Sequence, residues 1–234
     1  YMIYHPVSNY YYLFVSYGSL KSDYNIRIGR SRKITGPFYD YHGRSLAEDV
    51  DDDNTVGLML SCGYRWFDGI PYMAPGHNSV LMNPDGRMFL VSHIREMNFK
   101  TDHEPSTLQI RQLYLTPDGW LTAAAQPYAG ETLQPLSADD LTGNYERIAL
   151  TPSIPQGIQC AHPFRLLENG RMECCSIVGT WEMAGPYTLT LRYGNTTEFL
   201  TASPAWDREL ERPTLMLSGL SSKGICSWYK KRPN

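Results

Sequence analysis

Asn9-Tyr-Tyr-Tyr-Leu-Phe-Val-Ser-Tyr17 is rich in aromatic and β-branched residues and is followed by Gly18-Ser19, a pattern typical of a central strand that ends in a loop. Residues 24–31, Tyr-Asn-Ile-Arg-Ile-Gly-Arg-Ser, alternate in polarity as a half-buried strand does. We expect these two strands to pair antiparallel. The turn at residues 35–38 then leads to a short outer strand or loop at Tyr39 to Gly43.

A second copy of this pattern follows. Asn83-Pro-Asp-Gly86 predicts a hairpin-type turn, and the strands expected at residues 87–94 and 107–115 repeat the roles of the first pair. A repeat of sheet units predicts blades of a β-propeller, separated here by roughly 80 residues, so each blade contains long loops. Because two blades cannot close a ring of four to eight, the remaining blades are expected N-terminal to residue 1.

The character of the sequence changes after Trp120. Residues 126–140 predict a connector, and short strand-like segments alternate with glycine turns from Leu141 onward. Thr188 to Tyr193 alternate strictly, which predicts one buried and one solvated face. The predicted segments are 143–150, 164–167, 171–178, 179–183, 187–193, 197–202, 213–217 and 225–230. The chain is therefore predicted to be all-β, with propeller blades over 1–125, a connector over 126–140 and a small barrel or sandwich over 141–234.

Composition excludes several classes of partner. The chain has 234 residues, a net charge of -3 and 17 tyrosines, and no apolar run approaches the roughly 20 residues that span a bilayer. Neither nucleic acid nor a membrane is expected as a partner. Five cysteines lack paired metal spacing, so we expect core thiols rather than zinc ligands. The first residues show no secretory signal, so the compartment stays unknown from this chain, which is expected to be the C-terminal part of a longer or processed one.

One histidine stands out in Gly69-Ile-Pro-Tyr-Met-Ala-Pro-Gly-His-Asn-Ser-Val80, where glycine and proline can hold His77 in a fixed direction. On its own the stretch predicts a tight turn entering a strand, with His77 only hydrogen-bonded. His93 and His103 have no motif partner and are interpreted as structural. The acidic run at residues 48–54 is interpreted as a solvated loop, because a calcium loop would need a central glycine and a downstream bidentate glutamate.

Taken together, residues 10–17, 24–38 and 73–80 resemble glycoside hydrolase family 43, and within it the endo-acting α-1,5-L-arabinanases. The likeness continues more weakly through residues 179–182, 189–195 and 219–230, which are similar to the accessory β-barrel of longer members. It implies a five-bladed propeller with an Asp base, a second Asp and a Glu acid in the central cavity. Hydrolysis with inversion needs an acid and a base far enough apart to admit one water.

The resemblance also assigns roles to residues of this chain. His77 matches the histidine that binds a calcium-centred water cluster in the propeller channel, and Ca²⁺ is the implied cofactor. Tyr17, Gly18 and Ser19 match a loop near the sugar subsites, although an ordinary strand end is an equal interpretation. Asn25 and Arg27 share one side of an extended strand, where Arg27 is a hydrogen-bond donor to a sugar or carboxylate, or else a surface residue.

The catalytic residues themselves are expected elsewhere. In similar enzymes the acid Glu lies a few residues before the segment that matches Tyr1 to Tyr4, so no catalytic carboxylate is assigned in this chain. The resemblance implies an arabinan substrate, an N-terminal propeller segment as partner, and a secreted or periplasmic enzyme of which this chain alone is inactive. Two alternatives stay open: a non-catalytic polysaccharide-binding module, and a family 43 exo-arabinanase, arabinofuranosidase or xylosidase.

Overall fold

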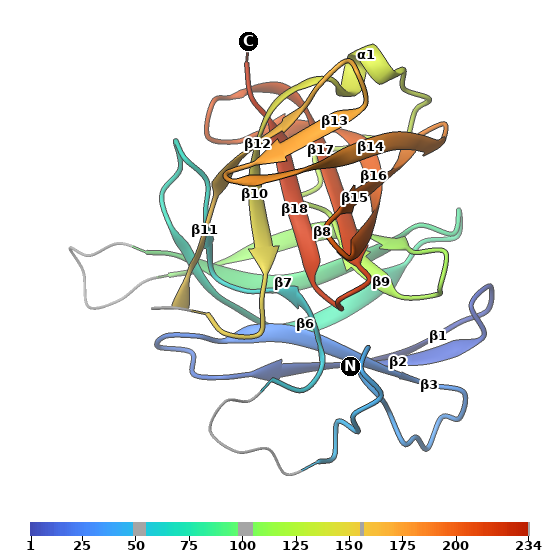
Figure 1. The fold of residues 1–234 in the computed structure, drawn as a ribbon. Helices are drawn as coiled ribbons and strands as arrows, with labels where there is room; N and C mark the ends of the chain where they lie inside the picture. Colours follow the sequence, from blue (N-terminus) through green and yellow to red (C-terminus); the bar gives the residue numbers. More distant parts are fainter. Residues whose placement is uncertain (49–54, 98–104, 155–156, 234) are drawn as a thin grey trace.

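The computed structural model describes residues 1–48, 55–97, 105–154 and 157–233. The acidic run beyond Glu48 and His103 lie outside these ranges. The described chain forms two open sheets followed by a closed barrel (Figure 1). No helix in the described part is long and apolar enough to cross a membrane.

The first sheet is an antiparallel, four-stranded blade in the order β1-β2-β3-β4. Its strands are β1 (Met2–His5), β2 (Tyr10–Tyr17), β3 (Asn25–Ser31) and β4 (Leu58–Ser61). The predicted pairing of the two N-terminal strands is confirmed, with Tyr11 opposite Ser31 and Tyr17 opposite Asn25. Period-two alternation on β2 places Tyr12 and Phe14 in the core.

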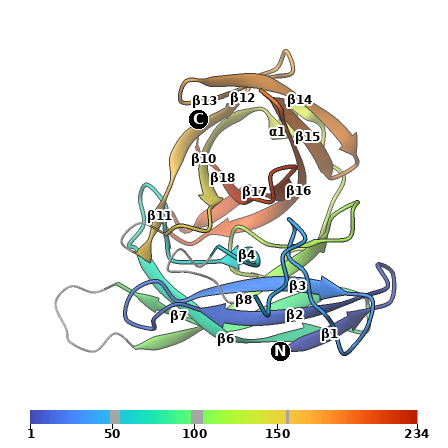
Figure 2. The same cartoon turned by 60° about the horizontal axis from the view of Figure 1, so that its bottom comes forward.

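The second sheet has six strands in the order β11-β5-β6-β7-β8-β9, namely β5 (Tyr64–Arg65), β6 (Tyr72–Met82), β7 (Met88–Glu96), β8 (Ser106–Leu115), β9 (Leu121–Ala123) and β11 (Gln159–Cys160). β6 to β9 form an antiparallel meander, as the repeat predicts. β11 comes from the C-terminal region of the chain and pairs in parallel with β5. Figure 2 shows the two sheets lying against each other beside the wall of the barrel, which is seen end-on.

The barrel closes through eight antiparallel strands, from β10 to β12 and on to β18, which pairs back with β10. They are β10 (Gly143–Leu150), β12 (His162–Leu166), β13 (Arg171–Cys174), β14 (Ile177–Gly185), β15 (Thr188–Tyr193), β16 (Thr196–Asp207), β17 (Arg212–Ser221) and β18 (Cys226–Lys231). The one helix described, α1 (Ala138–Leu141), precedes them, capped by Ser137. Closure leaves no free strand edge in this unit.

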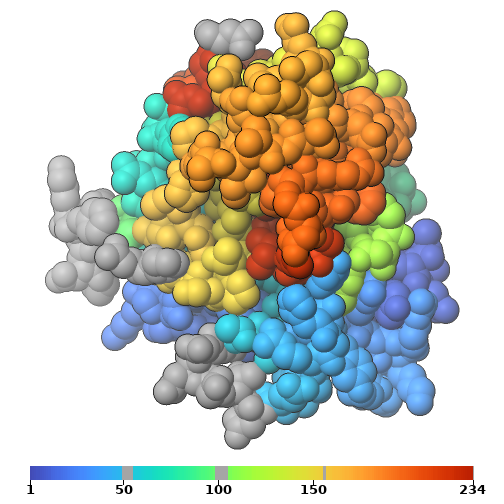
Figure 3. Space-filling view, in the orientation of Figure 1, coloured from blue at the N-terminus to red at the C-terminus, as the bar shows by residue number. Residues whose placement is uncertain are grey.

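The barrel strands divide their side chains between two cores. On β18, Tyr229 points into the barrel and joins a cluster with Phe164 and Leu200, whereas Trp228 joins the cluster that fills the space between the sheets and the barrel. The Trp228 ring Nε1 donates to the carbonyl of Ala123 at 2.8 Å. The outer face of the barrel is therefore packed against the blades, and Figure 3 shows the two parts meeting in one continuous surface.

Three sequence-based expectations are wrong in detail. Residues 171–178 form two strands, because a turn at Cys175, with φ of 53°, separates β13 from β14. Thr190 is buried beside Leu189 and Leu191, so β15 has no fully solvated face. Cys160 and Cys175 are exposed rather than core thiols, although the other three cysteines are buried. The all-β class, the blade-like repeat and the barrel are confirmed.

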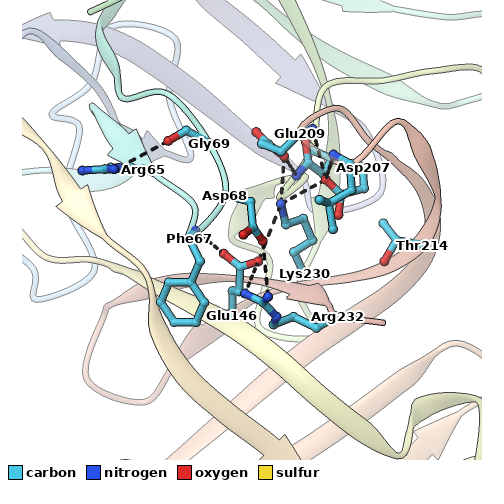
Figure 4. A network of polar contacts seen from close by, with 12 residues as sticks. Arg65, Phe67, Asp68, Gly69, Glu146, Asp207, Glu209, Thr214, Lys230 and Arg232 are labelled. Carbon is cyan, nitrogen blue, oxygen red and sulfur yellow. Dashed lines mark hydrogen bonds and ion pairs between the residues drawn. The ribbon is translucent and has the colours of Figure 1, made fainter. Parts of the chain in front are cut away.

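A buried ion cluster lies where the barrel meets the second sheet (Figure 4). The Nζ of Lys230 is 2.8 Å from Glu209, 3.0 Å from Asp207 and 3.8 Å from Glu146, and the Lys230 side chain has no solvent exposure. Burial disfavours the ammonium, but the carboxylates, first of all Glu209, outweigh this and raise the pKa of Lys230.

The same cluster reaches the second sheet through Glu146. The backbone N–H of Phe67 donates to Glu146 at 2.5 Å, and Arg232 lies 3.5 Å from Glu146 and 3.3 Å from Asp68 (Figure 4). Phe67 and Asp68 lie between β5 and β6, while Glu146 and Arg232 belong to the barrel. Charged hydrogen bonds thus fix the barrel to the blade.

Candidate functional site

His77 lies inside β6 rather than in a turn before it, which corrects the sequence-based expectation. β6 begins at Tyr72, but its register against β7 shifts between Met73 and Gly76 and again before Ser79. His77 has φ of 49° and its backbone N–H donates to Oγ of Ser16 on β2 at 3.2 Å. These irregularities bend the strand and leave the imidazole exposed.

Gly76 is required by an aromatic ring. A Cβ atom on Gly76 would lie 2.0 Å from the Tyr24 ring, so any other residue would require the ring to move. Tyr24 stacks on His93 of β7 with a centroid distance of 5.9 Å and an interplanar angle of 16°. Burial lowers the pKa of His93, and its Nε2 has no hydrogen-bond partner among the described residues. His93 supports the strand that carries His77, consistent with its predicted structural role.

The loop after β2 is held by Asp23. Its carboxylate accepts the backbone N–H of Ser19 at 2.9 Å and the hydroxyl of Ser22 at 2.8 Å. The hydrogen bond from Ser19 is the main cause that lowers the pKa of Asp23. Gly18 has φ of 79° and approaches Asp23 closely, so this turn also needs glycine. Gly18 and Ser19 are exposed at the tip of this loop.

Arg27 is buried, so its interpretation as a surface strand residue is wrong. Its Nε donates to Asn25 Oδ1 at 2.8 Å, and its Nη atoms donate to the carbonyls of Val56 at 3.0 Å and Pro152 at 3.2 Å. Its guanidinium lies 5.1 Å from the centroid of the Tyr17 ring. Burial lowers the pKa of Arg27. Arg27 therefore fixes Tyr17 and Asn25 and connects the first blade to the segment after β10.

The structure brings the predicted residues together in two linked groups. Tyr17, Asn25 and Arg27 contact one another, while His77 is joined to Ser16, the neighbour of Tyr17. Sequence reasoning missed Ser16 and Tyr24. Tyr24 was predicted as the first residue of a strand, and only the three-dimensional packing shows that its ring meets Gly76.

The residues present do not by themselves form a calcium site. Ca²⁺ takes six to eight oxygen ligands, and His77 offers one exposed imidazole. In the described part of the chain no group of three or more His, Cys, Asp or Glu side chains is placed to hold a metal ion. Asp23, the one carboxylate within residues 16–27, is already bound within its own loop. The side chains here can orient a ligand, but they do not include a pair of free carboxylates for acid and base catalysis.

Both parts of the chain match models of known protein families. A model of the glycosyl hydrolases family 43 matches residues 3–121, and a model described as a C-terminal lipocalin-like domain of the same family matches residues 125–229.

Individual relatives of the chain are arabinanases. An extracellular endo-α-(1→5)-L-arabinanase of Bacillus subtilis is 31% identical over 99% of this chain and 52% of its own length. One from Thermotoga petrophila is 30% identical over 97% of this chain and 51% of its own. A crystal structure of the Thermotoga petrophila endo-1,5-α-L-arabinanase has a TM-score of 0.86 and 28% identity, covering 100% of this chain and 55% of that one. The chain thus spans about half the length of these relatives.

Proposed function

The chain belongs to glycoside hydrolase family 43, and from this membership we propose that it is the C-terminal half of an arabinan endo-1,5-α-L-arabinosidase. The observation that carries the proposal is the tandem order of the family 43 region and the C-terminal lipocalin-like domain along a chain that aligns over nearly its whole length with relatives named endo-arabinanases. The catalytic Asp, Asp and Glu are then supplied by an N-terminal propeller segment, which is a partner for the described blades.

The outer face of the first sheet supports such a segment. Met2 is 39% exposed and Tyr4 42% exposed, and Tyr4 packs on Tyr11 with a centroid distance of 4.9 Å. The opposite face of the same strands is buried in the core, so the exposed face is apolar and unpartnered among the described residues. Soluble proteins seldom leave such faces uncovered, and a neighbouring blade would cover this one.

The second sheet has a matching open face. Val91 and Ile110 lie opposite each other on β7 and β8 and are partly exposed, and Leu108 is 70% exposed. The neighbouring positions on β7, Leu90 and Ile94, point into the core. In a closed propeller each blade packs between two others. Two neighbouring blades taken from such a ring would therefore expose an apolar face on each outer side, as these two sheets do.

In this proposal the residues of the chain position substrate and do not cleave it. The sugar subsites are lined by Tyr17, Gly18 and Ser19. Asn25 and Arg27 hold this loop in place, because the buried Arg27 guanidinium contacts Tyr17, Asn25 and two backbone carbonyls. His77 is exposed on the strand that follows and would contribute one nitrogen to a hydrated cation. Bound Ca²⁺ would stabilise negative charge near the catalytic carboxylates.

We further propose secretion of the enzyme. The relatives are named as extracellular arabinanases, and a polymeric substrate has to be met outside the cell.

Cleavage of debranched arabinan tests the function. We expect the full-length protein to release arabino-oligosaccharides with inversion at the anomeric carbon, as followed by NMR, and the 234-residue chain alone to release none. Size-exclusion chromatography and intact-mass measurement of the active material then show whether a second polypeptide accompanies the chain. A stable, active monomer of 26.7 kDa would overturn the proposal that the catalytic carboxylates lie on another segment. Binding of arabinan without cleavage by the complete assembly would favour the polysaccharide-binding module instead.

A further inference from the structure

A cleft lies at the other end of β3 from Asn25 and Arg27. It has a volume of about 650 Å³ and is lined by the end of β3, the loop that follows it and the buried Trp120. Its walls combine three basic side chains, Arg30, Arg32 and Lys33, with the rings of Tyr10, Tyr39 and Tyr41. The chain as a whole has a net charge of -3, so a basic cleft is a local feature rather than a property of the whole surface.

The two arginines are held in place by aromatic rings. The Arg30 guanidinium lies 4.3 Å from the Tyr10 centroid and 4.1 Å from the Trp120 ring, and the Arg32 guanidinium lies 3.7 Å from the same Tyr10 ring. Two positive groups therefore lie around one tyrosine. Their like charges repel, and stacking on an electron-rich ring offsets part of this cost.

Backbone carbonyls fix the guanidiniums further. Nη1 of Arg30 donates to the carbonyls of Asp118 and Gly119 at 2.7 and 2.8 Å. Nη1 of Arg32 donates to the carbonyls of Ser8 and Asn9 at 2.9 and 2.8 Å. Each guanidinium has five N–H donors, so Nε and Nη2 remain for a ligand. Among the described residues neither arginine pairs with a carboxylate.

The one carboxylate in the cleft wall is already neutralised. Asp40 is 4% exposed and accepts the backbone N–H groups of His42, Arg44 and Gly57 at 2.9 to 3.1 Å. It also forms an ion pair with the Arg44 side chain at 3.1 Å. The positive charge of Arg30, Arg32 and Lys33 is thus left for another anion.

The cleft lies away from the exposed outer face of the first sheet. Tyr10 and Tyr12 project from the same face of β2. Tyr12 points into the core, and its hydroxyl donates to the carbonyl of Gly119 beside Trp120. Met2, Tyr4 and Tyr11 lie on the opposite face, where a neighbouring blade would pack. The cleft therefore opens at the rim between two sheets that are both present.

We propose that this cleft binds a uronic acid residue of an acidic polysaccharide. Arg32 and Lys33 pair with sugar carboxylates, since a guanidinium donates two parallel N–H bonds to a planar carboxylate. The Tyr39 ring, 44% exposed, offers the apolar face of a sugar ring a stacking surface. The combination selects a ligand that carries both a carboxylate and a pyranose face. The site binds polymer and takes no part in bond cleavage. Uronate binding can therefore be tested independently of the proposed arabinanase activity.

Affinity electrophoresis and calorimetry of the full-length protein test the site with de-esterified polygalacturonate as the probe. We expect binding that weakens as sodium chloride is raised and that is lost with the fully methyl-esterified polymer. The double variant Arg32→Gln/Lys33→Gln should lower affinity at least about tenfold, roughly 1.4 kcal/mol. Tyr39→Ala should weaken polygalacturonate binding while leaving the weaker binding of polyphosphate unchanged.

The matched control is Arg165→Gln/Arg171→Gln, which removes the same charge from exposed barrel side chains. It should bind polygalacturonate like the unaltered protein. An equal loss in both double variants, equal binding of the methyl ester, or equal affinity for polyphosphate and single-stranded RNA would each overturn the proposal. Release of arabino-oligosaccharides by the unaltered protein is measured separately, so failure of that activity is not confused with failure of this site.

Discussion

The ammonium group of Lys230 lies 2.8 Å from a carboxylate oxygen of Glu209, at a place where the lysine side chain has no contact with solvent. Two more carboxylates, those of Asp207 and Glu146, lie within 4 Å of the same nitrogen. One cation thus compensates several buried anions at the junction between the barrel and the second sheet.

Replacing Lys230 with Met should lower the free energy of unfolding by about 3–5 kcal/mol, because buried carboxylates would lose their partner. Chemical denaturation measured by tryptophan fluorescence checks this. Lys223→Met is the matched control, since Lys223 is exposed in the turn before β18 and should change stability by less than about 0.5 kcal/mol. Similar losses in the two variants would show that the cluster contributes little.

The variant Glu146→Gln should change the pH dependence of stability. Burial raises the pKa of Glu146 despite the Phe67 N–H, Lys230 and Arg232, so the folded state binds this proton more tightly than the unfolded state does. The resulting stability is present at low pH and is lost as pH rises through the folded-state pKa. Glu146→Gln does not titrate, so its free energy of unfolding relative to that of the unaltered protein should increase from pH 4 to pH 8.

Asp207→Asn should show the opposite trend. Burial opposes ionisation of Asp207, but hydrogen bonds from Glu209 and Leu210 and the charge of Lys230 together lower its pKa. The stability this adds is present above the unfolded-state pKa and is lost as pH falls. The penalty of Asp207→Asn should therefore shrink below pH 4 in urea titrations. A penalty independent of pH would contradict this assignment.

Gly76→Ala should destabilise the protein by about 1–3 kcal/mol, because the added methyl group meets the Tyr24 ring. A double-mutant cycle with Tyr24→Ala isolates this clash. In the Tyr24→Ala background the same glycine substitution should cost less than about 0.5 kcal/mol. Additive effects would show that the ring is not what requires glycine.

His77→Ala should lower kcat on debranched arabinan about 10- to 100-fold with little change in KM, if His77 holds a cation near the catalytic carboxylates. Adding a chelator should lower the kcat of the unaltered enzyme by a similar factor but have no additional effect on His77→Ala. His42→Ala, which removes another exposed histidine, is the control. A chelator effect that persists undiminished in His77→Ala would refute this role of His77.

Two of the five cysteines should react with a thiol reagent in the native protein. Cys160 and Cys175 are exposed, whereas burial raises the pKa of Cys62 to about 12 and also raises those of Cys174 and Cys226. Thiolate is the reactive form, so the buried thiols react only after unfolding. A colorimetric thiol count before and after guanidinium addition should rise from two to five.

The strands could be predicted because each carries its own local pattern. The segment 143–150 corresponds residue for residue to β10, and the paired strands at the N-terminus follow from alternation and a glycine turn. Contacts between distant residues could not be predicted in this way. The burial of Arg27 depends on Pro152, 125 residues away, and nothing near Arg27 in the sequence indicates that carbonyl.

The candidate site shows the same division. The glycine and histidine at 76–77 predicted a turn before a strand. The strand instead runs through this position with two register shifts, because β7 and the ring of Tyr24 determine its path. The Lys230 cluster was missed altogether, since Glu146 is more than 80 residues from its lysine and carries no motif.

The parallel pairing of β11 with β5 gives the chain an interwoven construction. β11, which follows the first barrel strand, returns to complete the edge of the second sheet. Dividing the chain between the regions matched by the two family models would therefore separate β11 from β5. A chain that ended before residue 159 would leave the outer edge of β5 without its partner strand, so the second sheet is complete only when the barrel region is present.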